Sequence, residues 1–480
     1  MSPSLYQALL VLAVLSLPIR AEDWTRFRGP NGSGISSDKG FPTEFSKSKN
    51  LVWRTPVRPG KSSPVLTSRY IFLTGAEKDQ LFTQCFNRET GKLLWERTEV
   101  RMYKKDGNLL NHAAAITPVT DGENVYSFFR DFGLISYDGV GNLRWKVQLG
   151  PFINIAGMSA SPILAENSII VLADQIRGSY IAAFDRRSGE MRWKAARKET
   201  ESWTTPLLYD SPCSNPLIIT AAGGQYGAHS VSDGKRVLTK LGSSQAVVAS
   251  PVLSGGIIYA FGYGLDDKSS FVAYLAQLDK NHDGQISPDE YLNAPEDPDH
   301  LTAGILSVIG DSMGNGDGTV TKEKFDAVRR ELTGPSRLLA MRLNCESGAQ
   351  KGDPNFHEIW RYQKSFDGVV PSPLVYDGVV YLIKSGGILT ALDGLTGRVL
   401  KIGRVRGALG GYSASPVAAD GKVYLANEEG KVAVLKAGRD WELLAVNDLG
   451  EGTYATPALS EGRIYLRTDD ALYCIGISHR

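Results

Sequence analysis

The chain has 480 residues, 42% of them hydrophobic, and this size and composition exclude a disordered or fibrous protein and favour a globular one with a large core. The 53 basic and 52 acidic residues cancel, so the overall charge gives no reason to expect a nucleic-acid or anionic-membrane partner. The charge is uneven along the chain, because residues 266–331 hold 14 acidic and 6 basic residues while the remainder is mildly basic.

Residues 1–21 have the features of a secretory signal peptide. The apolar run LVLAVLSLPI, residues 10–19, is too short to span a membrane and is followed by Arg20-Ala21 and polar sequence. A buried N-terminal strand or helix is the alternative interpretation of this run. We expect an exported protein, periplasmic or extracellular, without a membrane span.

A Ser/Thr-Pro pair recurs along the chain at a period of about 44 residues. Each copy is followed by alternating strands joined by a tight turn, as in ASPVAADGKVYLAN, residues 414–427, where Asp-Gly forms the turn. A third strand and a fourth, which carries a Trp in several copies, complete the unit. Four-stranded units at this period predict an all-β protein, an eight-bladed β-propeller. The eight pairs begin at Ser63, Thr117, Ser161, Thr205, Ser250, Ser372, Ser415 and Thr456.

The two ends of the chain predict how the ring closes. The last copy, residues 455–477, stops after its third strand. NLVWRTPV, residues 50–57, is an isolated fourth strand that contains Trp53. We therefore expect blade eight to be shared between the two termini. The four cysteines are scattered without metal-ligand spacing and are interpreted as small core residues: Cys85, Cys213, Cys345 and Cys474.

The stretch DKNHDGQISPDE, residues 279–290, matches a 12-residue EF-hand calcium loop at every ligand position. Gly284 supplies the sharp turn, and residues 269–278 have the apolar spacing of an entering helix. A polar turn that binds no metal is the alternative interpretation. We expect one calcium ion, held by Asp279, Asn281, Asp283, the Gln285 carbonyl, Ser287 and a bidentate Glu290.

A second loop is centred on Gly318, 34 residues after Gly284. Position 1 is Met313 and position 12 is Lys324, so the first ligand and the bidentate ligand are both missing. We interpret this second hand as structural. The sequence thus divides into propeller segments 22–264 and 336–480, with an EF-hand pair, residues 265–335, inserted between the second and third strands of blade five. Loops that join second and third strands lie on the same face of the ring as the loops between blades, the face where propellers commonly bind ligands. The pair is therefore expected to cap the region beside the central mouth.

The repeat resembles that of pyrroloquinoline-quinone (PQQ)-type propellers. Ala183, Asp185, Gly189 and Trp193 carry the repeat pattern, and the opening DWTRFRGPNGSG, residues 23–34, is typical of exported bacterial PQQ-like proteins related to BamB. This resemblance covers the chain from residue 23 onward apart from the insertion, and it implies the fold more specifically than the activity.

Residues that precede the Ser/Thr-Pro pairs are expected at the mouth of the ring, where aromatic and cationic side chains could bind a protein, a small molecule or a glycan. They are Lys61, His112, Met158, Trp203, Tyr412 and Tyr454, with further hairpin tips at Arg130, Arg177, Tyr226, Tyr263, Lys384, Glu428 and Arg467. The alternative for each of them is an ordinary solvated rim.

Three classes of function follow from these features. We favour an exported binding or assembly scaffold with calcium in its insertion. The resemblance also implies a second class, a PQQ-dependent quinoprotein dehydrogenase. Against it, the chain has no adjacent pair of cysteines and no cluster of Asn, Glu and Asp that suggests a second calcium site near the channel. A hydrolase is disfavoured because no G-x-S-x-G motif and no nucleophile with an oriented base is evident.

Overall fold

The computed structural model describes residues 23–103, 111–152, 154, 156–199, 201–211, 215–243, 247–264, 270–293, 306, 309–310, 317–344, 355–364 and 370–477. The expected signal peptide, Cys213, Cys345 and Met313 lie outside these residues. Among the described residues, no helix is long and apolar enough to cross a membrane.

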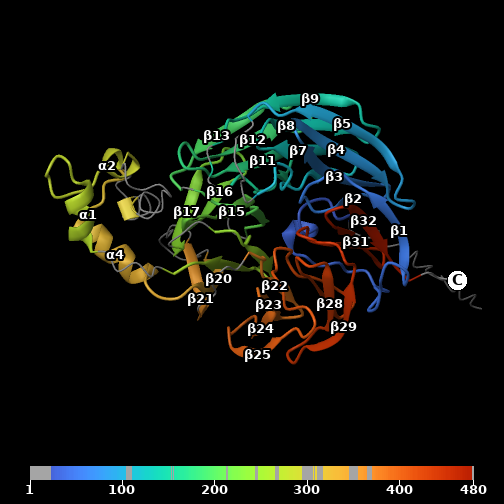
Figure 1. Ribbon diagram of the computed structural model, residues 1–480. Helices are drawn as coiled ribbons and strands as arrows, with labels where there is room; N and C mark the ends of the chain where they lie inside the picture. Colours follow the sequence, from blue (N-terminus) through green and yellow to red (C-terminus); the bar gives the residue numbers. More distant parts are fainter. Residues whose placement is uncertain are drawn as a thin grey trace, which may run out of the picture.

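The chain folds into eight four-stranded antiparallel sheets arranged around a common centre (Figure 1), which confirms the eight-bladed β-propeller. In blades one to four the strands run in chain order from the centre outward. Blade one holds β2 (Val65–Leu66), β3 (Tyr70–Glu77), β4 (Gln80–Asn87) and β5 (Leu93–Val100); blade two holds β6 (Val119–Thr120), β7 (Asn124–Phe129), β8 (Gly133–Asp138) and β9 (Leu143–Gln148). Blade three holds β10 (Ile163–Ala165), β11 (Ser168–Ala173), β12 (Tyr180–Asp185) and β13 (Met191–Ala196); blade four holds β14 (Leu207–Tyr209), β15 (Leu217–Ala221), β16 (Gly224–Ser230) and β17 (Arg236–Ser243).

Blades five to seven repeat the same order. Blade five holds β18 (Val252–Ser254), β19 (Ile257–Gly262), β20 (Arg337–Asn344) and β21 (Asn355–Gln363); blade six holds β22 (Leu374–Tyr376), β23 (Val379–Lys384), β24 (Ile388–Asp393) and β25 (Val399–Arg404). Blade seven holds β26 (Val417–Ala419), β27 (Lys422–Ala426), β28 (Lys431–Lys436) and β29 (Glu442–Asp448).

Blade eight is formed by both ends of the chain. Its three inner strands are β30 (Ala458–Ser460), β31 (Arg463–Arg467) and β32 (Ala471–Ile475), and its outermost strand is β1 (Leu51–Pro56). β1 pairs antiparallel with β32, and Trp53 lies opposite Cys474. The N-terminal strand therefore closes the ring as the sequence predicted. Cys85 and Cys474 are buried and free.

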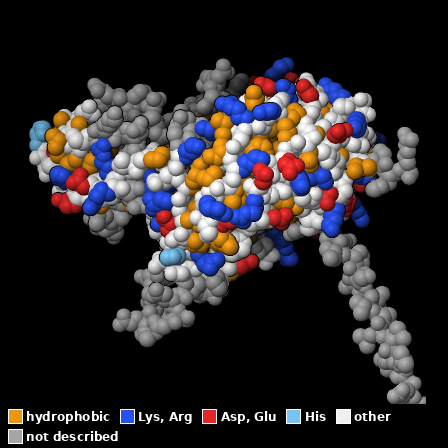
Figure 2. Space-filling view, turned by 90° about the horizontal axis from the view of Figure 1, so that it is seen from below, with side chains coloured by type: hydrophobic (Ala, Val, Ile, Leu, Met, Phe, Trp, Pro, Cys, Tyr) orange, Lys and Arg blue, Asp and Glu red, His pale blue; other side chains and the backbone are white. Residues whose placement is uncertain are grey.

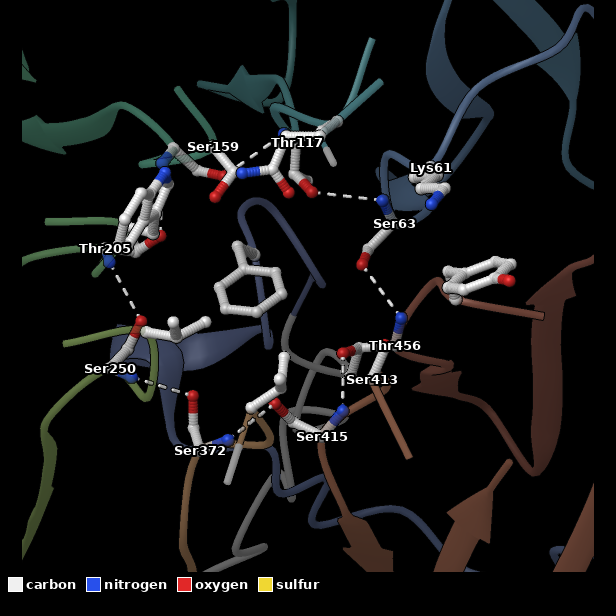
Figure 3. A pocket seen from close by; sticks show the side chains of 18 of the residues that line it. Lys61, Ser63, Thr117, Ser159, Thr205, Ser250, Ser372, Ser413, Ser415 and Thr456 are labelled. Atoms are coloured by element: carbon white, nitrogen blue, oxygen red, sulfur yellow. Dashed lines mark hydrogen bonds between the residues drawn. The ribbon is translucent and has the colours of Figure 1, made fainter. Parts of the chain in front are cut away.

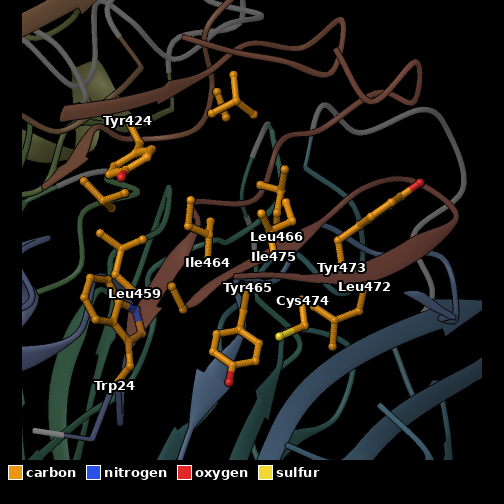
Figure 4. Close-up of a cluster of buried hydrophobic side chains, with 14 of the residues drawn as sticks. Trp24, Tyr424, Leu459, Ile464, Tyr465, Leu466, Leu472, Tyr473, Cys474 and Ile475 are labelled. Atoms are coloured by element: carbon orange, nitrogen blue, oxygen red, sulfur yellow. The ribbon is translucent and has the colours of Figure 1, made fainter. Parts of the chain in front are cut away.

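The hydrophobic core lies between neighbouring blades, because each sheet is covered on both faces. Figure 4 shows one part of it, where side chains of β31 and β32 meet Trp24 from the N-terminal segment and Tyr424 from blade seven. Trp24, Tyr424 and Tyr465 are each 0% exposed. The segment before β1, which includes a short 3₁₀ helix η1 (Pro30–Gly32), is thus part of the core.

The insertion leaves the ring between β19 and β20, and its described helices are α1 (Phe271–Leu278), α2 (Pro288–Leu292) and α4 (Lys322–Leu332). They have a small core of their own, against which Leu241 of β17 packs. In Figure 1 the helices lie at the side of the ring, next to β17, and not over its centre, and in Figure 2 the molecule projects to the same left-hand side. The expected cap beside the mouth is therefore wrong for the described helices, because their apolar contact is with the outermost strand of blade four.

Candidate functional site

The Ser/Thr-Pro pairs form a closed ring of hydrogen bonds around the centre of the propeller (Figure 3). In each blade the backbone N–H of the Ser or Thr donates to the side-chain hydroxyl of the Ser or Thr in the next blade. The distances range from 2.8 Å, for Thr205 to Ser250, to 3.1 Å, for Thr117 to Ser161. The eighth bond, from Thr456 to Ser63, joins the last blade to the first at 3.0 Å. The repeated motif therefore holds the blades together at their inner ends.

A cavity of about 490 Å³ lies at the centre of this ring. All eight ring residues line it, so they border one common volume. Each hydroxyl oxygen accepts a backbone N–H, which leaves its own hydrogen for donation. Lys61, Asn111, Trp203, Tyr454 and Phe27 complete much of the wall. A space of this size, with convergent polar groups and aromatic surfaces, is suited to a small ligand or to a loop of a partner.

Of the expected mouth residues, Lys61, Trp203 and Tyr454 are brought together at this cavity. The Lys61 Nζ lies 3.9 Å from the centroid of the Tyr454 ring, a cation–π arrangement that fixes the ammonium at the rim. Trp203 Nε1 donates to the Gly157 carbonyl at 2.8 Å, so the indole ring has a defined orientation. These three side chains come from different blades and meet only because the ring closes.

Other expected mouth residues lie elsewhere. Tyr412 is 1% exposed, and its hydroxyl donates to the Ala408 carbonyl at 2.5 Å, so it belongs to the core below the surface. Tyr226 is equally buried, and Met158 packs between blades two and three. His112 accepts from the Ala114 N–H through Nδ1 at 3.2 Å, and burial together with nearby cations such as Arg467 lowers the pKa of its imidazole to about 4. It is therefore neutral at pH 7.

The floor of the cavity is a feature that the repeat pattern did not reveal. Phe27 lines the cavity, whereas its neighbours reach beneath the ring. Arg26 donates to the Pro206 carbonyl at 2.6 Å and Arg28 donates to the Pro373 carbonyl at 2.8 Å. Burial lowers the pKa of both arginines to about 9. The N-terminal segment thus forms the floor of the cavity. In the sequence, the only indication of this role is the run of large residues before the first strand.

A buried network of charges supports the segment that carries Trp203. The Asp174 carboxylate accepts from Arg197 at 2.6 and 3.1 Å and from the Ser202 hydroxyl at 2.6 Å. Arg197 also lies 2.8 Å from Nε2 of His229. All four side chains are fully buried, and none of them lines the cavity. Because the hydroxyl donates to a carboxylate and has no access to a ligand, we interpret the network as structural.

The expected calcium loop lies between α1 and α2, where its carboxylates bond to the loop's own backbone. Asp279 Oδ2 accepts the Gly284 N–H at 3.0 Å and Asp283 Oδ1 accepts the Gln285 N–H at 2.8 Å. Glu290 accepts from the Ser287 N–H at 2.8 Å within a capping box. Gly284 has a φ of 79°, which the sharp turn requires.

In this arrangement, no group of three or more His, Cys, Asp or Glu side chains is placed to hold a metal in the described part of the chain. Calcium binding by the loop therefore remains a prediction. Asn281 and Ser287 bond within the same loop, where the Asn281 amide donates to Asp283 at 2.9 Å and the Ser287 hydroxyl donates to Glu290 at 2.9 Å.

The cavity does not fit a quinone that needs its own calcium ion. Lys61 is the only charged side chain among the described lining residues, and no carboxylate from these residues reaches the cavity to ligate a metal. The hydroxyl ring and Lys61 could bond the oxygens of many ligands, so the lining gives no specific preference for a quinone. The described residues provide a binding cavity without an evident general base.

These features define the class of protein: an eight-bladed β-propeller with a central cavity and a helical insertion in one blade. The chain belongs to the family described as outer membrane protein assembly factor BamB, whose model matches residues 78–273 and 342–478. None of the curated proteins matches the chain.

Solved structures are similar to the chain at low sequence identity. BamB from Moraxella catarrhalis has a TM-score of 0.55 and 13% identity, over 88% of this chain and 100% of that one. The computationally designed Ika8 protein has a TM-score of 0.53 and 11% identity, over 91% and 100% of the two chains. A europium-containing methanol dehydrogenase reaches a TM-score of only 0.41 at 10% identity, over 86% and 89%. The first two comparisons agree on the fold.

Proposed function

We propose that the protein is an exported scaffold that binds a ligand or a segment of a partner protein in the central cavity of its propeller. The observation that carries this proposal is the convergence of eight hydroxyl groups, Lys61 and the Trp203, Tyr454 and Phe27 rings on one cavity of about 490 Å³. A cavity with few charges and several aromatic faces is typical of a binding site.

The lining residues suggest how such a ligand would bind. Hydroxyl donors and Asn111 would bond to carbonyl, hydroxyl or carboxylate oxygens. Trp203 and Tyr454 would stack on a sugar ring, an aromatic group or a proline. Lys61 would attract a negative group to the rim. The family description, an assembly factor, supports a protein segment as the occupant.

Calcium binding by the insertion and export belong to the same proposal. The first loop has all six EF-hand ligand positions, and the loop lies between two helices that pack on each other. Export rests on the apolar run near the N-terminus and on membership of a family described as an outer membrane assembly factor.

Native mass spectrometry and absorption spectroscopy of protein purified from an exporting host test the proposed binding. We expect a bound molecule that is lost in Lys61→Met and retained in Lys436→Met, a matched change at an exposed lysine away from the cavity. Retention of the molecule in Lys61→Met to the same extent as in Lys436→Met would contradict a binding site that includes Lys61. A bound redox-active quinone would overturn the scaffold in favour of a dehydrogenase.

A further inference from the structure

The second loop of the insertion contains a buried ammonium group. Lys324, at the start of α4, has a side chain that is 7% exposed. Its Nζ donates to the Thr319 carbonyl at 2.8 Å, to the Gly310 carbonyl at 2.9 Å and to Oδ1 of Asp317 at 3.2 Å. An ammonium has three hydrogens to donate, and these oxygens are among its acceptors.

Two of the three oxygens around this ammonium belong to residues that correspond to metal-ligand positions of the first loop, while the Gly310 carbonyl comes from before the second loop. Aligning Gly318 with Gly284 places Asp317 at position 5 and Thr319 at position 7, which provide a carboxylate and a backbone carbonyl in an EF-hand. Lys324 itself occupies position 12, where Glu290 stands in the first loop. A cationic side chain therefore comes from the position that normally supplies the bidentate carboxylate.

We infer that the Lys324 ammonium is a built-in cation that takes the place of a metal ion in the second loop. It pairs with Asp317 and donates to the Thr319 and Gly310 carbonyls, so the described residues 317–324 of the second loop keep their arrangement without calcium. Removing it would leave the buried Gly310 carbonyl and the partly buried Thr319 carbonyl without this donor, which is costly, whereas the Asp317 carboxylate is half-exposed. This part of the inference does not depend on calcium binding by the first loop.

The second loop is joined directly to the first. Ile286 and Val320 exchange backbone hydrogen bonds of 3.1 and 2.9 Å, and both side chains are 0% exposed. Phe325, next to Lys324, packs on Phe271 of α1 with ring centroids 5.6 Å apart. If residues 317–325 keep their arrangement without calcium, they would therefore hold the first loop in position for calcium. This extension rests on the proposed calcium site.

Hydrogen exchange in the presence of a chelator tests the built-in cation. Lys324→Met is compared with Lys322→Met, the same change two residues away on an exposed side chain of α4. We expect the amides of Val320 and Phe325 to exchange at least about tenfold faster in Lys324→Met than in Lys322→Met, which should match the wild type. Equal protection in the two variants would overturn the inference.

Lys324→Glu combined with Met313→Asp provides a second test, because the two changes replace the ammonium and restore both carboxylate ligands that the second loop lacks. Protection of residues 317–332 should then increase with calcium more than in the wild type. A response no greater than that of the wild type would contradict a cation site at this position.

Calcium titration by calorimetry tests the extension to the first loop. Wild type and Lys322→Met should bind one equivalent with equal affinity, and Lys324→Met should bind about tenfold more weakly. Two equivalents in the wild type would overturn the inference. If no variant binds calcium, the proposed calcium site fails, while the exchange measurement in chelator still decides the role of Lys324.

Discussion

Single hydroxyl groups fasten the centre of this propeller, because each one accepts the backbone N–H of the preceding blade. The repeat of Ser/Thr-Pro pairs was evident in the sequence, and it predicted the blade count. The sequence did not show which backbone N–H each hydroxyl accepts, because these bonds join residues 41 to 393 positions apart and require a closed ring. Each bond contributes to the free energy of unfolding because its donor and its acceptor are both buried, so that losing one partner leaves the other unsatisfied.

Replacing Ser250 with Ala should lower the free energy of unfolding by about 1–3 kcal/mol, since the buried Thr205 N–H would lose its acceptor. Ser232→Ala, at an exposed turn, is the matched control and should change the free energy by less than about 0.5 kcal/mol. Urea unfolding measures both. A Ser250→Ala variant as stable as the control would show that the ring contributes little.

His229 should make stability depend on pH. Burial, and then the Arg197 charge, lower the pKa of its imidazole from 6.5 to about 3. The unfolded chain therefore binds more protons between pH 3 and 6.5, so stability should fall as the pH drops through this range. Between pH 7.5 and 5 the loss from this residue is about 2 kcal/mol.

Urea unfolding of wild type and His229→Gln at the two pH values isolates this effect. The variant should lose less stability than the wild type on acidification. His357→Gln, at an exposed position, should behave as the wild type does. An equal pH dependence in His229→Gln and wild type would contradict a buried neutral imidazole.

Neighbouring blades are joined by a Trp of one outermost strand that lies over a turn Gly of the next blade. Trp145 of β9 covers Gly189, and its Nε1 donates to the Arg186 carbonyl at 3.3 Å. The sequence predicted a fourth strand that carries a Trp in several copies of the repeat. It did not show which glycine each one covers, since that depends on the twist of adjacent blades.

Gly189→Ala should be more destabilising than Gly421→Ala. Both glycines have positive φ, at 77° and 70°, so both variants incur a backbone cost of about 1–2 kcal/mol. An added Cβ at Gly189 would lie 2.6 Å from the Trp145 ring, whereas nothing lies within 4 Å at Gly421. Thermal unfolding should separate the two variants by at least about 1 kcal/mol. Equal melting temperatures would contradict tight Trp packing.

The insertion should bind one calcium ion that Glu290→Ala abolishes, because position 12 supplies both oxygens of its carboxylate to the ion. Asp289→Ala changes an exposed neighbour that has no ligand position and should bind as the wild type does. Calorimetric titration of the full chain measures both. Unchanged binding by Glu290→Ala would contradict an EF-hand site.

The order of the predicted strands located this insertion between the second and third strands of blade five. It did not predict where the insertion packs on the ring. The pattern put it on the face of the central mouth, whereas α4 and Leu241 show that it packs beside β17. A contact between one apolar side chain of an outer strand and a helix leaves no periodic signal. Arg177, at a hairpin tip, donates a hydrogen bond to the Leu292 carbonyl of the insertion, and the sequence did not indicate this contact either.

The whole molecule is a closed ring with a floor made by its own N-terminal segment. The sequence predicted the closure, because the missing strand and the isolated strand complement each other. The floor depends on bonds such as Asn31 to the Leu208 carbonyl, 177 residues away, and no repeat encodes them. The pattern placed Lys61, Trp203 and Tyr454 at the mouth, and these three line the cavity, but it did not distinguish them from Tyr412, which is buried.

Site-specific photo-crosslinking in the exporting cell tests the proposed binding at the cavity most directly. A photoreactive residue in place of Val370, which lines the cavity, is compared with one in place of Leu395, an exposed turn residue that does not. We predict a discrete crosslinked species with the probe at 370 that Lys61→Met weakens, and none with the probe at 395. Equal crosslinking at both positions, or at 395 alone, would contradict a scaffold that binds through its central cavity.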